Sequence, residues 1–387
     1  MSHLIPSGAQ TYSKAPSAYP ANAPRRIVAA DGAWVTCEDG RQYIDCVSAL
    51  GAVMLGHNDP AVNHAAFRQM HRVVSASLPT YPESELAERL VKLIPGAEMV
   101  RYGKNGNDVV NAAVRIARAH TGRDIVLRNG YHGHADWCIE YPRAGGVLRA
   151  NIEARWHLGE VEFGAALLER TAAIVLDPRP AHDPVELPAA MWRDLRQMCD
   201  EHGTALILDE MVTGFRGGHP GYPVGVVPDL WCGAKALGNG WPITVLAGRA
   251  DLMCRLERDV FYSTTFAGEA VSIAAANACL EEMERTHATA TVQALGKLIR
   301  EAYEQQAASY GVDTWVESYD ARPVLRFRDP EDQRIFGEAC IAAGLLLHAA
   351  PYVNVMVAHE ECLRELVGAL GEGLRAVAER KVVKEAA

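Results

Sequence analysis

Two side chains capable of chemistry, Asp209 and Lys235, each follow a short apolar stretch of the sequence. Residues 205–208 are continuously apolar, which predicts a buried strand that ends at the paired acids Asp209 and Glu210. Residues 228–232 form a second apolar patch and predict the next strand, shortly before Lys235. Because open α/β sheets bind ligands at the carboxyl ends of their strands, we expect the acid and the lysine to share one ligand site.

An acid and a lysine placed in this way suit one cofactor, pyridoxal 5′-phosphate. The cofactor needs a lysine to form a Schiff base and an acid to keep its ring nitrogen protonated. The alternative for Lys235 is an ordinary surface charge, as most lysines are. Its neighbours favour the cofactor role, because they are apolar or permit close approach; they are Trp231, Gly233, Ala234, Ala236, Leu237, Gly238, Gly240 and Trp241.

A turn rich in glycine and asparagine could hold the phosphate of such a cofactor. Residues 100–102 predict a short strand, and residues 109–120 have the apolar spacing of an amphipathic helix. Asn105, Gly106 and Asn107 lie between them, where free N–H groups and the helix dipole favour an anion. An ordinary N-cap turn is the alternative for this motif.

The segment that follows the predicted strand at residues 124–128 carries a second possible chemistry. His132, His134, Asp136 and Cys138 alternate, and alternating ligands on an extended chain could hold Zn²⁺ on one face. A zinc-dependent hydrolase is therefore a remote alternative. Since no second ligand cluster stands elsewhere, we predict no metal site and expect instead a buried His132 that forms a hydrogen bond near the cofactor.

The order of the predicted elements indicates the fold class. Strands and helices alternate from about residue 100 to residue 250, which predicts an α/β fold with a mostly parallel, doubly wound sheet in a large cofactor domain, residues 59–284. A smaller α+β domain is built from the N- and C-terminal segments, namely an arm and a meander at 1–58 and the remainder at 285–387. The arm, residues 1 to about 25, is either mobile or ordered over the active site.

Composition excludes several classes of protein. A net charge of −10 over 387 residues argues against a surface for nucleic acid or for anionic membranes. No apolar run approaches the roughly 20 residues that span a bilayer. We see no signal peptide, and nine scattered cysteines without a CxxC pair favour free thiols. We therefore expect a cytoplasmic location.

Six motifs, in order and at similar spacing, resemble those of the class III aminotransferase group of fold-type-I pyridoxal-phosphate enzymes. The resemblance is nearest to the branch that contains glutamate-1-semialdehyde aminomutase, and it covers nearly the whole chain. The motifs are DGRQYID at 39–45, LGHNDP at 55–60, YHG at 131–133, LDEMVTGFR at 208–216, PDLWCGAKALGNGWP at 228–242 and TTFAG at 264–268.

The resemblance implies roles for further residues. Tyr131 would stack on the pyridine ring, with Met211 as the other candidate for clamping a ring face. Glu210 would lie in the hydrogen-bond network behind the ring, and Thr265 would donate to the phosphate of the other subunit. The family usually has Ser-Gly-Thr where this chain has Asn105, Gly106 and Asn107, so amide or backbone contacts would replace hydroxyl contacts. A homodimer with shared active sites is also implied.

The resemblance implies transfer of an amino group between small-molecule amines and carbonyl compounds. Many members bind the substrate carboxylate with an arginine near the C-terminus, and residues 351–359 contain none. Residues 358–361 resemble the aminomutase branch, although the glutamate that the aminomutase carries just before them has no counterpart. We therefore expect an aminotransferase for a keto-sugar or another specialised carbonyl compound. An intramolecular aminomutase and a cofactor-binding regulator without catalysis are the alternatives.

Overall fold

The structure is a computed structural model, and it describes residues 4–139, 143–153, 155–157, 168–179, 188–218, 220 and 225–385. The chain divides into two compact units. The central unit is Ala61–Glu281, and the terminal unit combines Met1–Pro60 with Glu282–Ala387. None of the described helices is long and apolar enough to cross a membrane.

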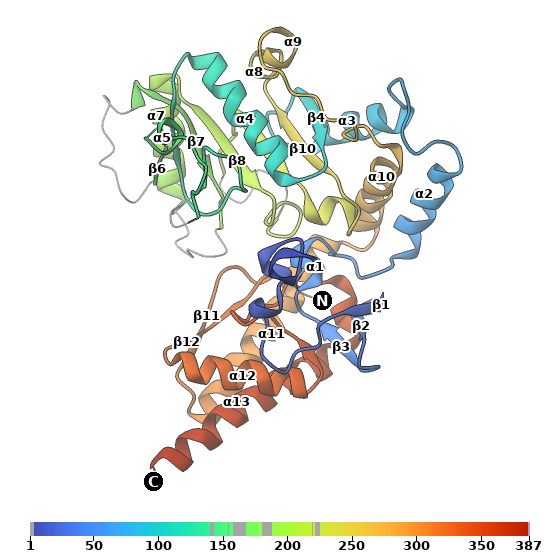
Figure 1. The fold of residues 1–387 in the computed structure, drawn as a ribbon, viewed down its shortest axis with the longest axis vertical. Coiled ribbons are helices and arrows are strands. Elements are labelled where there is room, and N and C mark those ends of the chain that lie inside the picture. The colour runs from blue at the N-terminus through green and yellow to red at the C-terminus, as the bar shows by residue number, and fades with distance from the viewer. Residues whose placement is uncertain are drawn as a thin grey trace. The chain divides into compact units, whose positions relative to one another are not determined.

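A seven-stranded sheet, counted over the described residues, forms the middle of the central unit (Figure 1). Its order is β4-β10-β9-β8-β7-β5-β6. Within it β10 runs antiparallel to both neighbours, while the other neighbouring pairs are parallel, which confirms the predicted mostly parallel sheet. The strands are β4 (Met99–Gly103), β5 (Ile125–Arg128), β6 (Arg155–His157), β7 (Thr171–Leu176), β8 (Ala205–Glu210), β9 (Leu230–Gly233) and β10 (Thr244–Gly248).

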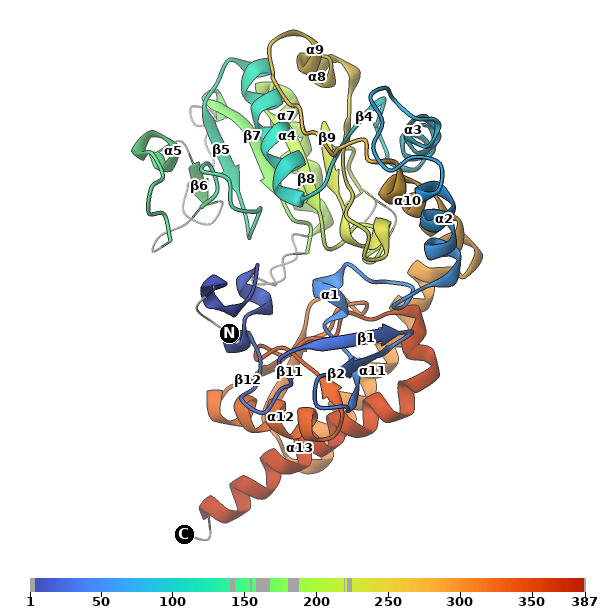
Figure 2. The same cartoon turned by 45° about the vertical axis from the view of Figure 1, so that its right-hand side comes forward.

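Helices cover this sheet because its middle strands are apolar on both faces. Every residue of β7 and β8 is buried, as expected for strands covered on both sides. Helix α4 crosses one face (Figures 1 and 2) and places its valines, isoleucine and alanines in the main core. The helices of the unit are α2 (Pro60–Met70), α3 (Tyr81–Leu93), α4 (Gly106–Thr121), α5 (Arg149–Glu153), α7 (Ala189–His202), α8 (Ala250–Met253), α9 (Arg255–Arg258) and α10 (Ala270–Arg285).

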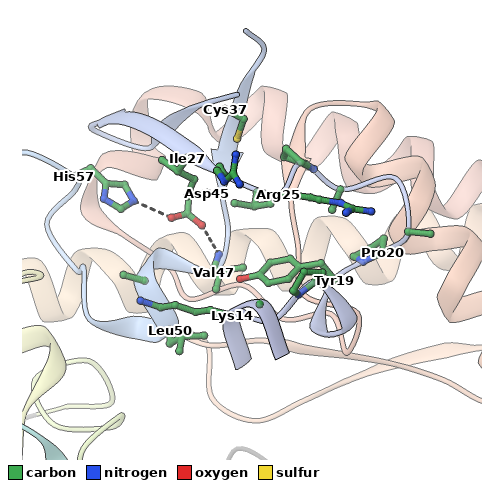
Figure 3. A pocket seen from close by; sticks show the side chains of 18 residues that line it. Lys14, Tyr19, Pro20, Arg25, Ile27, Cys37, Asp45, Val47, Leu50 and His57 are labelled. Carbon is green, nitrogen blue, oxygen red and sulfur yellow. Dashed lines mark hydrogen bonds and ion pairs between the residues drawn. The ribbon is translucent and has the colours of Figure 1, made fainter. Parts of the chain in front are cut away.

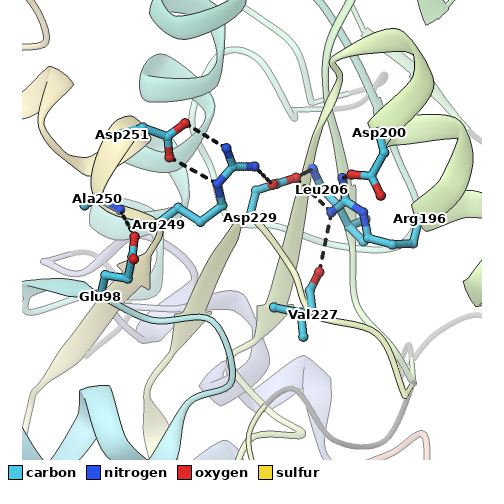
Figure 4. Close-up of polar contacts among 9 residues, drawn as sticks. All are labelled: Glu98, Arg196, Asp200, Leu206, Val227, Asp229, Arg249, Ala250 and Asp251. Carbon is cyan, nitrogen blue, oxygen red and sulfur yellow. Dashed lines mark hydrogen bonds and ion pairs between the residues drawn. The ribbon is translucent and has the colours of Figure 1, made fainter.

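A buried carboxylate, Asp229, ties strands β8 and β9 together at their amino ends. Its two oxygens bind Arg249 at 2.6 Å and Arg196 at 2.8 Å, and one also accepts the N–H of Leu206 at 2.8 Å (Figure 4). The Asp229 N–H in turn donates to the Leu206 carbonyl. The carboxylate is 4% exposed, so these donors compensate a charge that water does not reach.

In the terminal unit, α13 packs against α11 and α12, and α12 also contacts strand β13 of a small sheet (Figure 2). The sheet has the order β1-β2-β3-β13, and its first three strands form the predicted antiparallel meander. A separate antiparallel pair joins β11 and β12. The elements are α1 (Ser48–Gly51), β1 (Ile27–Asp31), β2 (Trp34–Cys37), β3 (Gln42–Asp45), α11 (Ala288–Tyr310), β11 (Thr314–Glu317), β12 (Val324–Phe327), α12 (Pro330–Ala342), β13 (Leu345–Leu346) and α13 (Leu363–Glu385).

The N-terminal arm packs on this unit. Its three short 3₁₀ turns are η1 (Pro6–Gly8), η2 (Tyr12–Lys14) and η3 (Pro16–Ala18). The Ala18 carbonyl accepts the N–H of Ala349 at 2.8 Å. The amide Nδ2 of Asn22 donates to the Glu338 carbonyl at 2.8 Å. These bonds connect the arm to the C-terminal part of the same unit.

The apolar residues at 353–357 predict a strand, but the structure has none there, so this prediction is wrong. The segment is extended and buried, but its backbone bonds go to irregular segments on both sides. Val355 donates to the Ala321 carbonyl, and Asn354 donates to the Cys46 carbonyl. Because neither partner belongs to a strand, the alternating apolar pattern here reflects burial between loops. A 3₁₀ helix, η6 (Val357–Cys362), follows and precedes α13.

Candidate active site

Six strands of the central unit run in the same direction and end at one edge of the sheet. They are β4, β5, β6, β7, β8 and β9, because β10 is antiparallel to both β9 and β4. The carboxyl ends of such strands form the usual ligand crevice of an open α/β sheet. Asp209 lies on β8 at this edge, Asp177 follows β7, and Lys235 follows β9.

Asp209 and His132 form a buried pair at this edge. Atom Nδ1 of His132 lies 2.7 Å from Oδ2 of Asp209, and the Met211 N–H donates to Oδ1 at 3.1 Å. Both side chains are almost fully buried. Because a carboxylate only accepts, Nδ1 carries the proton. The remaining ring nitrogen, Nε2, is buried and has no hydrogen-bond partner among the described residues.

Asp177 is a second carboxyl group beside this pair. It was not among the site residues predicted from the sequence. Burial first, and then the negative charge of Asp209, raise the pKa of Asp177 to about 6. The N–H of Arg179 donates to Oδ1 of Asp177 at 2.9 Å and lowers this pKa, as do electrostatic interactions with His132 and Lys235. The signal available in the sequence was a third apolar strand that ends in an acid, at 172–177.

Lys235 begins a short 3₁₀ helix, η5 (Lys235–Gly238), directly after β9. Its φ is +47°, in the left-handed region that residues other than glycine seldom adopt. Such strain persists where the surrounding structure fixes it, and it is frequent at functional sites. The half-buried side chain therefore leaves the strand end in a defined direction.

The predicted phosphate turn lies at the start of α4. Asn105 is the N-cap, and its N–H donates to Asp108 at 2.8 Å. The N–H groups of Gly106 and Asn107 begin the helix and have no partner in the part of the chain that the structure describes. A Cβ on Gly106 would lie 3.0 Å from the Met211 sulfur, so this turn approaches Met211 closely.

The side chain of Asn107 holds the segment that carries Tyr131 and His132. Its Oδ1 accepts the N–H of His134 at 2.9 Å. Gly133 has a φ of +106°, and a Cβ there would lie 2.8 Å from the same oxygen. The asparagine therefore fixes the path of this segment after β5.

Three other predicted residues have different surroundings. Glu210 is fully buried, but its carboxylate accepts a hydrogen bond from the Trp231 indole on the opposite face of the sheet. Adjacent strand residues point to opposite faces, so Glu210 cannot share the face of Asp209. The Tyr131 side chain is 69% exposed, and Thr265 is exposed on the turn before α10.

The histidine cluster that prompted the zinc alternative does not converge. The Cys138 thiol donates to the Ala135 carbonyl within its own turn, while His132 binds Asp209. Over the described ranges, no group of three or more His, Cys, Asp or Glu side chains is placed to hold a metal ion.

Comparison with known proteins identifies one family and several similar structures. A family model described as aminotransferase class III matches residues 17–151 and 150–319. The pyridoxal-phosphate internal aldimine form of the FumI protein of Sphingopyxis sp. MTA144 is 27% identical, with a TM-score of 0.90 over 98% of this chain and 95% of that one.

Two further solved structures share the fold. An omega-transaminase from Sphaerobacter thermophilus is 23% identical, with a TM-score of 0.86 over 97% of this chain and 95% of its own. A transaminase with bound pyridoxal phosphate is 21% identical, with a TM-score of 0.89 over 97% of this chain and 96% of its own. These likenesses confirm the predicted fold class.

Proposed function

The chain belongs to the class III aminotransferase family of pyridoxal-phosphate-dependent enzymes, and we propose that Lys235 and Asp209 hold the cofactor. In this proposal the central unit binds pyridoxal 5′-phosphate, and the enzyme moves an amino group to or from the carbonyl carbon of a small molecule. The observation that carries the proposal is the buried His132–Asp209 pair at the strand edge that also presents Lys235.

The residues at this edge suit the chemistry of the cofactor. A buried carboxylate that already accepts one imidazole N–H can accept a second from a protonated ring nitrogen. The unpartnered N–H groups of Gly106 and Asn107 at a helix N-terminus suit a phosphate. Lys235 follows β9 and Asp177 follows β7, at the same edge of the sheet.

Each side chain then has a distinct task. Pyridoxal phosphate, when bound, supplies an electron sink for the charge that develops on the carbon losing its proton. Asp209 keeps the ring-nitrogen proton in place, and His132 fixes the orientation of that carboxylate through Nδ1. Lys235 holds the cofactor through Nζ and afterwards takes the proton from the amino-bearing carbon of the substrate. Tyr131 and Met211 are the proposed ring contacts.

A second subunit is part of the proposal. Thr265 is exposed on the turn before α10, as a residue that reaches the phosphate of a partner subunit would be. We propose a homodimer with shared sites. Mixed dimers test this: an inactive Lys235→Ala chain combined with an inactive Thr265→Ala chain should regain part of the activity. If mixing restores none, Thr265 does not act across the subunits.

The substrate class is proposed from what residues 351–359 lack. They contain no arginine for a substrate carboxylate, which favours a keto-sugar or another specialised carbonyl compound over a simple amino acid pair. An aminomutase of the glutamate-1-semialdehyde type is the second candidate, supported by residues 358–361. Incubation with one amine at a time, with loss of the visible cofactor band as the readout, would find the donor. An aminomutase would instead convert a single substrate with no added acceptor.

A further inference from the structure

The terminal unit contains a cavity of about 490 Å³, separate from the residues assigned above. It lies between the N-terminal arm and the strands β1 and β3, and all its lining residues belong to this unit. Its volume is in the range that holds a small organic ligand. Figure 3 shows Tyr19 in the middle of the lining and the Lys14 side chain along one wall, on the side of Leu50.

Two positively charged side chains that line the cavity have no counter-ion among the described residues. Lys14 and Arg25 both line the cavity, and neither side chain forms a hydrogen bond or an ion pair with any described residue. The neighbouring Arg26 differs, because it pairs with Glu38 at 3.1 Å. Most arginines of this unit are likewise paired, for example Arg300 with Asp320 and Arg326 with Glu317.

The negative charge of the cavity is already compensated. Oδ1 of Asp45 accepts the N–H groups of Val47 and Ser48, at 2.9 and 3.0 Å. Oδ2 of the same residue lies 2.8 Å from Nε2 of His57. Since Asp45 is satisfied by these donors, the two unpartnered cations determine what the cavity attracts.

We infer that this cavity binds the anionic group of a small organic molecule, a phosphate or a carboxylate, through Lys14 and Arg25. The Tyr19 ring and the prolines of the arm supply apolar contact for the body of the ligand. The tyrosine stays protonated, because burial raises its pKa far above neutrality, so its hydroxyl adds no opposing charge. The inference does not depend on the proposed reaction, since every residue that it uses lies in the terminal unit.

Titration calorimetry with inorganic phosphate and with pyrophosphate tests this inference. The holoenzyme is first reduced with borohydride and desalted, so that the cofactor fills its own phosphate site. We expect saturable binding that weakens with added NaCl, and a loss of at least about tenfold in Lys14→Met and in Arg25→Met, the effect of one charge-assisted contact. Arg364→Met is the matched control, because Arg364 is also exposed and without a partner among described residues but lies outside the cavity.

Absence of binding to the wild type, or equal binding by all three variants, would overturn the inference. Kinetics then distinguish two sources of the anion. If Lys14→Met raises KM for an anionic amino donor and leaves KM for an uncharged donor of the same skeleton unchanged, the anion belongs to the substrate. If neither KM changes while phosphate binding is lost, a separate anion occupies the cavity. A protein that takes up no cofactor would contradict the proposed function, but its phosphate binding could still be measured.

Discussion

Nδ1 of His132 lies 2.7 Å from Oδ2 of Asp209, and both side chains are buried. This contact orients the carboxylate proposed to face the ring nitrogen of the cofactor. Loss of a hydrogen bond to a buried charge costs about 1.5–3 kcal/mol. We therefore expect His132→Ala to weaken pyridoxal-phosphate binding by roughly 10- to 100-fold, measured by equilibrium dialysis.

The control for this prediction is His134→Ala. The backbone N–H of His134 donates to Asn107, while its ring has no hydrogen-bond partner among the described residues. This variant should bind the cofactor as the wild type does. Equal cofactor affinities in the two variants would show that the His132–Asp209 contact does not position the carboxylate.

The raised pKa of Asp177 predicts that the free energy of unfolding depends on pH. Its pKa is raised from 3.8 to about 6 in the folded chain, so between these values the folded protein holds a proton that the unfolded chain has released. The stabilising contribution is complete below about pH 4 and is lost as the pH rises through 6. The neutral variant Asp177→Asn should therefore gain stability relative to the wild type between pH 4.5 and pH 7.5.

Urea unfolding of the cofactor-free proteins at these two pH values measures the effect. A difference between wild type and variant that is the same at both values would contradict the raised pKa. The variant itself removes the acid without removing the hydrogen-bonding shape of the side chain.

Gly133 allows the Asn107 side chain to hold the segment that bears His132. In Gly133→Ala, a Cβ would meet Asn107 Oδ1 at 2.8 Å, and the alanine would adopt a φ of +106°. We expect a loss of about 1–3 kcal/mol in the free energy of unfolding, together with weaker cofactor binding. Gly146→Ala is the control, since Gly146 also has a positive φ but no atom within 4 Å of an added Cβ. If the two variants lose equal stability, the contact with Asn107 contributes nothing.

We expect Asp229 to stabilise the fold and to take no part in catalysis. It lies at the amino ends of β8 and β9, away from Asp209, and binds Arg196 and Arg249 while buried. Removing one side of a buried ion pair leaves the other charge uncompensated, so Asp229→Asn should cost about 2–4 kcal/mol. Asp251→Asn, at an exposed partner of Arg249, should cost about 0–1 kcal/mol. Urea midpoints that fall equally in both variants would contradict this ranking.

Much of the fold could be predicted because local patterns and tertiary burial agree. The apolar run at 205–208 is found within β8, and the helix predicted at 109–120 is found within α4. The strand prediction at 353–357 was wrong for the opposite reason, because this segment is buried by loops and not by strands. Strand periodicity reports burial on alternating sides but does not identify the partner.

The site was harder to predict because it is formed by contacts between residues that are far apart in the sequence. Nothing in the sequence shows that His132 and Asp209 meet, 77 positions apart. Nor does it show that Asn107 would hold the backbone of His134. The position of Glu210 could have been predicted, because the residue after Asp209 on a strand must point to the other face.

We propose above that Nζ of Lys235 holds the cofactor. Residues 61–281 contain three lysines, Lys92, Lys104 and Lys235. Lys104 stands next to the phosphate turn but is paired with Glu269 at 2.9 Å, which makes it the informative competitor.

Borohydride reduction of the holoenzyme, followed by peptide mass spectrometry, identifies the lysine that holds the cofactor. We predict that the pyridoxyl group is found on the peptide that contains Lys235 and is absent from Lys235→Ala, which should also lose the visible absorption band of the wild type. A pyridoxyl group on Lys104, or an unmodified Lys235 in a reduced and cofactor-loaded protein, would contradict it.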